Sequence, residues 1–205
     1  MTGIRIVAPS GDGTAAAAAW PLPAVDQVFV ARLRARDPEA FTAIYERYKS
    51  QIYNYLLRLS GTAEMADDLT HDTFLSAYEA LPTLRDDSAI SAWLYRIASN
   101  RFRDTLRRKR VINWLHLGDR RDAEQSLSQM GGEEALPERE LVQLAMKQLK
   151  PEYAICLMLR LAEGFSTLET AAILKASPES VRMRLCRARV MFRDAYAAAE
   201  RGDIK

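Results

Sequence analysis

The sequence predicts an all-α protein made of two small helical domains joined by a flexible linker. Apolar residues recur at three- and four-residue spacing from Asp26 onward, and no stretch alternates as a half-buried strand would. Two such periodic regions are separated by about 25 residues with weak periodicity, a length typical of a linker. With 205 residues, of which 48% are hydrophobic, the chain can fill packed cores rather than remain disordered.

Residues 1–25 are rich in Gly, Ala and Pro, and we expect them to form a flexible N-terminal extension. As a signal peptide this stretch is poor, because Arg5 is its only basic residue. No apolar run reaches the roughly 20 residues of a membrane span. Cys156 and Cys186 form no CxxC pair, which fits a reducing compartment. The sequence therefore predicts a cytoplasmic protein with no membrane span, and with neither a metal site nor a cofactor.

The first helical domain is placed at residues 26–110. Pro38 is suited to the first position of a long helix, which Gly61 ends. A second helix follows and is stopped by Pro82. After a short loop comes the segment WLYRIASNRFRDTLRRKR, residues 93–110, in which aromatic residues give way to arginines.

Charge is strongly polarised within this domain, although the net charge of the whole chain is only +2. Residues 62–87 carry seven acidic side chains and one arginine, a net charge of −6. Residues 91–110 carry seven basic side chains and one aspartate, a net charge of +6. A chain polarised in this way can offer an acidic surface to one partner and a basic surface to another.

Placed on a helix, the segment after the loop has an apolar stripe and a polar stripe. The apolar stripe consists of Leu94, Ile97, Ala98, Phe102 and Leu106, and the polar stripe of Arg96, Asn100, Arg103 and Arg107. An asparagine amide can bond a base edge while flanking arginines hold phosphates. Apolar walls beside basic residues also suit unstacked single-stranded bases. Trp93 by itself is better explained as a core residue.

Residues 111–136 are predicted to be the linker, in which Trp114 and Leu115 are the apolar exceptions. The second domain, residues 137–197, contains two short helices with a tight break between them. The first opens with the capping box Ser166-Thr167-Leu168-Glu169. The second opens with Ser177-Pro178, a capping residue followed by a proline at the first position.

The second of these helices carries its basic residues outside its apolar stripe, which is made of Val181, Leu185, Ala188 and Phe192. Residues 175–193 hold six basic side chains and one acidic, a net charge of +5. This arrangement is typical of a helix-turn-helix whose second helix enters the major groove. An ordinary helical hairpin with a solvated basic face is the alternative.

Together these motifs resemble a bacterial RNA polymerase sigma factor of the extracytoplasmic-function (ECF) type in the sigma-70 family. The second conserved region of that family is matched in order by DPEAFTAIYERY, ADDLTHDTFLSAYEALP and SAWLYRIASNRFRDTLRRKR. The fourth region is matched by LKPEYAICLMLRLAEGFSTLETAAILKASPESVRMRLCRAR. The resemblance spans about residues 26–196 and implies a region 2 helical bundle tethered to a region 4 helix-turn-helix.

The resemblance implies a transcription initiation factor that binds RNA polymerase core, recognises the minus-thirty-five duplex, and melts and captures the minus-ten non-template strand. Its acidic helix would dock on the clamp helices of the largest catalytic subunit, with the flap of the second subunit as a further contact. The implied polymerase-binding residues are Asp68, His71, Asp72 and Leu75. His71 stands where the family more often has Gln, and a solvated acidic face is the simpler alternative. An anti-sigma factor is the expected inhibitory partner.

The resemblance also assigns DNA contacts residue by residue. Those implied at the minus-ten element are Leu84, Ser88, Ala89, Ile90, Arg96, Asn100, Arg103 and Arg107. Those implied at the minus-thirty-five element are Ser180, Arg182, Met183, Cys186 and Arg187. Met183 and Cys186 depart from the residues usual in the family, so the DNA sequence recognised does not follow from the resemblance.

Two other functions are the alternatives. A stand-alone helix-turn-helix transcriptional regulator would bind duplex DNA without polymerase and would not need the region 2 motifs. A hydrolase could use the cluster Asp67, Asp68, His71 and Asp72. However, the sequence has no phosphate-binding glycine loop, nucleophile elbow or HExxH motif, so no enzyme is predicted. The inducing signal, the regulon and the identity of the anti-sigma factor do not follow from the sequence.

Overall fold

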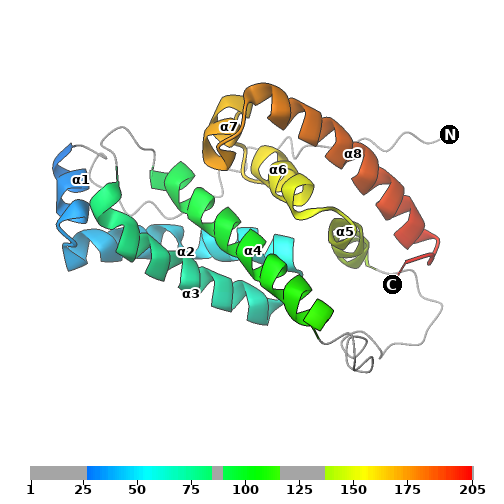
Figure 1. The fold of residues 1–205 in the computed structure, drawn as a ribbon, viewed down its shortest axis with the longest axis horizontal. Helices are drawn as coiled ribbons and strands as arrows, with labels where there is room; N and C mark the ends of the chain where they lie inside the picture. The colour runs from blue at the N-terminus through cyan, green and yellow to red at the C-terminus, as the bar shows by residue number, and fades with distance from the viewer. Residues whose placement is uncertain (1–26, 85–89, 116–136, 205) are drawn as a thin grey trace.

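The structure is a computed structural model that describes residues 27–84, 90–115 and 137–204. Those residues form eight α-helices and one short 3-10 helix, with no strand among them (Figure 1). The elements are α1 (Gln27–Arg34), α2 (Pro38–Ser60), α3 (Ala63–Ala80), η1 (Leu81–Thr83), α4 (Ile90–Leu115), α5 (Glu138–Lys147), α6 (Pro151–Leu161), α7 (Thr167–Leu174) and α8 (Pro178–Glu200). The predicted all-α class is confirmed.

The first domain is a bundle in which α2, α3 and α4 pack against one another, while α1 contacts α2 and η1. Helix α2 begins where the sequence predicts, because the Asp37 carboxylate accepts from the backbone N–H of Glu39 at 2.9 Å. It ends at Gly61, whose φ of +77° is the left-handed conformation that glycine adopts without strain. In the core, the Tyr55 hydroxyl bonds the Ser99 hydroxyl at 2.8 Å, which satisfies both buried polar groups.

The linker prediction was wrong at its start, because α4 continues to Leu115. No proline or glycine occurs between Arg110 and that residue, so the sequence contains nothing to stop the helix. Trp114 therefore lies in the last turn of α4 rather than in a linker. The rest of the predicted linker and the N-terminal extension lie outside the described residues.

The second domain is formed by α5, α6 and α7, all of which pack on the long helix α8. The predicted capping box is confirmed: Ser166 accepts from the Glu169 N–H, and the Glu169 carboxylate accepts from the Ser166 N–H at 2.7 Å. Lys175 then ends α7 with a positive φ of 49°, which leads into the tight turn before α8. The two helices of the helix-turn-helix begin at the predicted residues, and α8 continues to Glu200, beyond the predicted end of the domain at residue 197.

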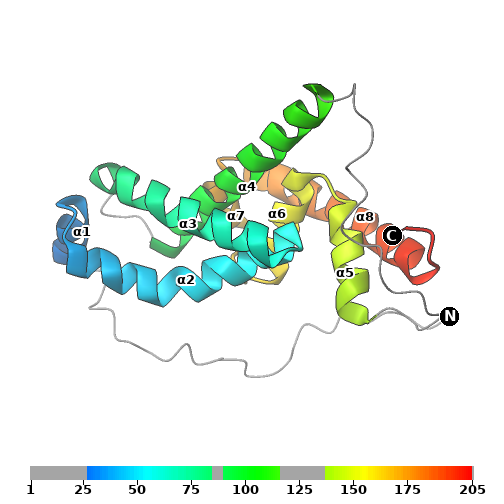
Figure 2. The same cartoon turned by 90° about the horizontal axis from the view of Figure 1, so that it is seen from below.

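The two domains lie side by side and contact each other (Figures 1 and 2). Helix α4 of the first domain packs on α7 of the second, and α2 packs on α5 and α6. The buried apolar residues of both domains join in one cluster across this contact. Within the described residues, no helix is long and apolar enough to cross a membrane.

Candidate nucleic-acid interface

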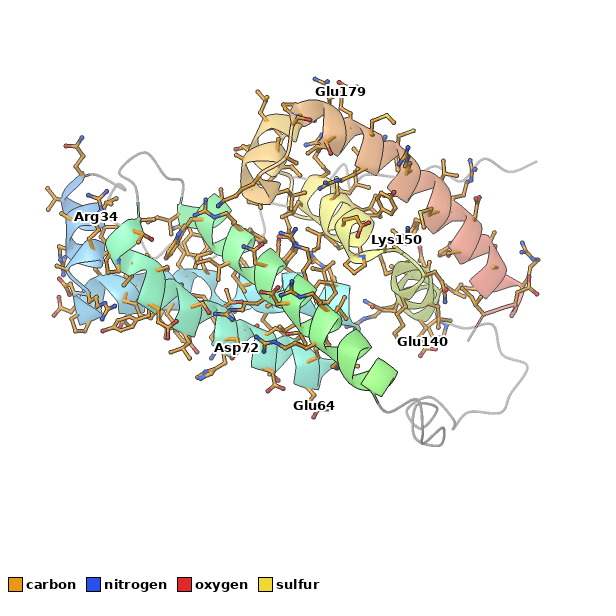
Figure 3. All side chains as sticks on the ribbon, in the orientation of Figure 1. Arg34, Glu64, Asp72, Glu140, Lys150 and Glu179 are labelled. Carbon is orange, nitrogen blue, oxygen red and sulfur yellow. The ribbon has the colours of Figure 1, made fainter. Side chains whose placement is uncertain are left out.

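The acidic face predicted for polymerase binding lies on α3. All four residues named for it are exposed: Asp68, His71, Asp72 and Leu75. Leu75 is 52% exposed, which is unusual for a leucine in a helix whose other face is packed. Figure 3 shows Glu64, from the first turn of α3, on the side of the molecule away from α7 and α8. The α3 face is therefore open to a partner in this conformation.

In the polar stripe of α4, Asn100 and Arg107 are exposed, whereas Arg96 and Arg103 are half-buried. Trp93, Tyr95 and Phe102 are each at most 5% exposed, whereas Asn100 is exposed. The Arg103 guanidinium donates to the Asn100 side-chain oxygen at 2.5 Å. This bond uses only the oxygen of the Asn100 amide and not the two donors of its N–H₂ group. The aromatic residues thus anchor the helix, and the polar residues remain available on its surface.

Helices α3 and α4 are joined by a direct side-chain bond. Arg101 donates from Nε to the Ser76 hydroxyl at 2.7 Å. Ser76 lies one turn beyond Asp72, so the acidic face and the polar stripe belong to a single packed unit. Arg107 forms an ion pair with Asp104 at 3.3 Å, and both side chains are exposed, so its contribution to stability is small.

The predicted loop contacts are only partly described. Leu84 and Ile90, which flank the loop, are 3% and 2% exposed and belong to the core in this conformation. Arg34 donates from Nε to the Leu84 carbonyl at 2.6 Å, which fixes the backbone where the loop begins. Ser88 and Ala89 lie outside the described residues. A base could touch the Leu84 or Ile90 side chains only if they left the core, so these contacts stay predictions.

Helix α8 presents the residues predicted for the upstream duplex. Its N-terminus is fixed by Ser177, whose hydroxyl accepts from the Ser180 N–H at 3.1 Å. Four of the five predicted side chains are exposed and Ser180 is half-buried; the exposed ones are Arg182, Met183, Cys186 and Arg187. The side chain of Arg182 pairs with Glu179 at 2.7 Å, and Figure 3 shows Glu179 at the N-terminal end of α8, at the top of the view. Both partners are exposed, so this pair is readily exchanged for a phosphate.

Cys156 is buried in the second domain, and burial raises the pKa of its thiol. Its thiol therefore stays protonated and packs as a small apolar group. Within the described parts of the chain, no three His, Cys, Asp or Glu side chains are grouped so that they could hold a metal ion.

One cluster between the domains was missed by the sequence analysis. Glu163, in the turn between α6 and α7, accepts from Arg58 at 2.9 Å and from the Tyr95 hydroxyl at 2.5 Å. Phe165 packs edge-to-face on the Tyr95 ring, with ring centroids 5.0 Å apart. We call Arg58, Tyr95, Glu163 and Phe165 the interdomain cluster. Arg58 and Glu163 are 105 positions apart, so no local pattern could reveal the cluster.

Comparison with known proteins agrees with this architecture. Residues 44–111 match the family model for sigma-70 region 2, and residues 139–191 match that for sigma-70 region 4. The chain is 30% identical over 177 residues to the RNA polymerase sigma-H factor of Pseudomonas aeruginosa, covering 80% of this chain and 90% of that protein. It is also 30% identical over 176 residues to the ECF RNA polymerase sigma-E factor of Escherichia coli, with the same coverage.

Solved structures of similar fold include two complexes. The sigma factor RpoE bound to the anti-sigma factor NepR, from Bartonella quintana, aligns with a TM-score of 0.62 and 21% identity, over 76% of this chain and 95% of that one. CnrH, in complex with the cytosolic domain of CnrY, aligns with a TM-score of 0.62 and 24% identity, over 85% and 98%.

A region 2 bundle followed by a region 4 helix-turn-helix defines a sigma factor of the sigma-70 type. The chain belongs to the ECF group of that family. The predicted family is therefore confirmed, and it is a family of transcription initiation factors rather than of enzymes.

Proposed function

We propose that this sigma factor docks on RNA polymerase core through α3 and opens promoter DNA with the neighbouring face of α4. The observation that carries this proposal is that α3 and α4 pack together, one with an exposed acidic face and the other with a basic, asparagine-containing stripe, and Arg101 of α4 is bonded to Ser76 of α3. Docking of α3 would place the α4 stripe at a fixed position on the polymerase. In this way one rigid unit can serve two partners of opposite charge.

At the minus-ten element, we propose that Asn100 bonds the edge of an extruded base while the arginines of the stripe hold the backbone. Extruding a base costs a few kcal/mol of stacking and pairing, and its capture offsets that cost. No covalent step is required. The full proposed contact set is Leu84, Ser88, Ala89, Ile90, Arg96, Asn100, Arg103 and Arg107.

At the minus-thirty-five element, we propose that α8 enters the major groove. Phosphate contacts from its arginines would supply much of the affinity, and only a few side chains would reach base edges. The proposed contact set is Ser180, Arg182, Met183, Cys186 and Arg187. Contact between this domain and the flap of the second large polymerase subunit is part of the same proposal, as is action in the cytoplasm.

An anti-sigma factor is the proposed inhibitory partner. Its support is that the RpoE structure of similar fold is itself a complex with an anti-sigma factor. The residues that such a partner would contact here do not follow from that likeness, because the identity is only 21%.

The test is transcription by purified core polymerase from a promoter library, with and without this chain. We expect the chain to direct initiation and Asp72→Arg to abolish binding to core. Glu46→Arg is the matched control, because it makes the same charge change at an exposed position of α2. Equal loss in both variants would contradict docking through α3. Tight duplex binding without any effect on core would instead indicate a stand-alone regulator.

A further inference from the structure

Among the described residues, the Glu163 carboxylate is more buried than the carboxylates that form ion pairs in α2, α4 and α8. The side chain of Glu163 is only 11% exposed, whereas every carboxylate in the pairs within α4 and α8 is at least 43% exposed. Glu163 accepts two bonds, one from the Arg58 guanidinium and one from the Tyr95 phenol. Charge-assisted hydrogen bonds to a largely buried carboxylate are stronger than ion pairs between solvent-exposed side chains.

Aromatic rings extend this contact into both cores. Tyr55, fully buried in the first domain, packs edge-to-face on Tyr95, and Tyr95 packs in the same way on Phe165. In both contacts the ring centroids are 5.0 Å apart. Such pairs contribute beyond their buried area. A continuous row of three rings therefore leads from the first domain into the second.

The interface between the domains is incompletely filled around the cluster. Two clefts, of about 430 and 390 Å³, are each lined in part by Arg58. The first is lined in part by Tyr95 and Glu163, and the second by Met146 and Met158. The cluster therefore bonds the two domains where their packing is incomplete, in addition to the contacts of α4 with α7 and of α2 with α5 and α6.

The closed arrangement brings the two DNA-binding surfaces too close together for joint use. A path through the protein sets an upper limit on the distance between Asn100 and Arg182. It runs along α4 to Tyr95, across the ring contact to Phe165, and then along α7 and α8 to Arg182. At 1.5 Å per helical residue and about 3.6 Å per extended residue, this path is at most about 60 Å long. The two promoter elements, by their names, are roughly 25 base pairs apart, or about 85 Å of straight duplex at 3.4 Å per base pair. The domains must therefore separate before both elements are bound.

We propose that the interdomain cluster is a self-inhibitory device, in which Glu163 holds region 4 against region 2 until the domains are drawn apart on polymerase. The inhibitory role of the cluster rests on the proposed function, whereas the closed conformation does not depend on that function. It requires no partner protein, and so is separate from restraint by an anti-sigma factor.

The test uses charge reversal and its compensation in the full chain. Glu163→Lys and Arg58→Glu each place like charges together, and each should shift the closed–open equilibrium toward open by roughly tenfold or more. The doubly exchanged chain, Arg58→Glu with Glu163→Arg, restores the ion pair but not the Tyr95 bond, so it should return partly to the closed form. Arg47→Glu, an exposed position on the same helix, is the charge-matched control.

Small-angle X-ray scattering measures the closed–open balance, because the radius of gyration rises as tethered domains separate. Initiation with limiting core polymerase measures the consequence. We expect both single variants to be larger and more active than the parent chain, with the exchanged pair between them and the control unchanged. Tyr95→Phe, which removes only the hydroxyl, should show a milder form of both effects.

Two results would overturn the inference. Unchanged scattering in Glu163→Lys would mean that the cluster does not hold the domains together. Expansion with no rise in initiation would mean that the closed form is not inhibitory. If the parent chain and all variants fail to initiate from any promoter while expansion still occurs, the proposed function fails and the inhibitory role fails with it, but the closed conformation stands.

Discussion

Two buried tyrosines predict that the folded chain loses stability in alkali. Tyr55 is completely buried, and burial raises its pKa well above the ordinary value. Tyr95 is 4% exposed, and its pKa is raised first by burial and then by its bond to Glu163. Both phenols therefore stay protonated in the folded chain at a pH where an unfolded tyrosine, with a pKa near 10, has ionised.

The sign and size of the effect follow from proton linkage. Above about pH 10 the unfolded chain binds fewer protons than the folded chain, so the free energy of unfolding falls as the pH rises. Each tyrosine contributes a slope of about 1.4 kcal/mol per pH unit, and the two together lower stability by about 2.8 kcal/mol at pH 11. Below pH 10 this contribution is fully present. A loss of that size is a large part of a typical total of about 5–15 kcal/mol.

The assay is urea unfolding, followed by circular dichroism, at pH 8, 10 and 11. Phenylalanine cannot ionise, so Tyr55→Phe and Tyr95→Phe should each lower the alkaline slope by about 1.4 kcal/mol per pH unit, while the buried Cys156 thiol contributes equally in all three chains. Each variant also loses a hydrogen bond and starts less stable at pH 8, so the slope and not the level is compared. Identical slopes in the parent chain and both variants would refute the argument.

Three further outcomes are expected from the DNA-binding faces and from the helix cap. Asn100→Ala should reduce permanganate reactivity of the melted minus-ten region while leaving closed-complex formation nearly intact, since it removes about 1–3 kcal/mol of base contact; an equal loss in both would assign it another role. Arg187→Ala should weaken minus-thirty-five duplex binding and reduce the slope of log affinity against log salt by about one, whereas Arg201→Ala, at the far end of the domain, should leave that slope unchanged. Ser166→Ala should cost about 1 kcal/mol, or about 2–4 °C in Tm by calorimetry, and Ser166→Asp should retain most of that stability.

Local chemistry made much of the fold predictable from the sequence. Ser166 and Ser177 were identified as helix starts because a short polar side chain that precedes an apolar-periodic run can accept from the free N–H groups of the first turn. Burial of Trp93 and Phe102 followed from their helical spacing. The end of α4 was missed because weak amphipathicity was taken for a linker, although nothing in the sequence interrupts the helix.

The interdomain cluster lies beyond such reasoning. Arg58 occurs in a long amphipathic helix, and Glu163 in a turn, and neither position breaks a local rule. Their pairing arises only because α4 packs on α7 and α2 on α6, which is a long-range property of the whole chain. The same limit applies to the loop side of the minus-ten site, where Leu84 and Ile90 are apolar enough to serve either a core or a base pocket.

The placement of Tyr95 explains how closure can restrain this sigma factor without covering its DNA-binding faces. Tyr95 and Asn100 lie on one helix but on different sides of it, so the second domain contacts Tyr95 while Asn100 remains exposed. The exposed residues of α8 are likewise not covered by the first domain. Closure therefore leaves each surface free to bind its own DNA element, and prevents only the simultaneous binding of both. The closed chain should accordingly bind short oligonucleotides carrying either element as well as Glu163→Lys does, and differ from that variant only on a duplex that contains both.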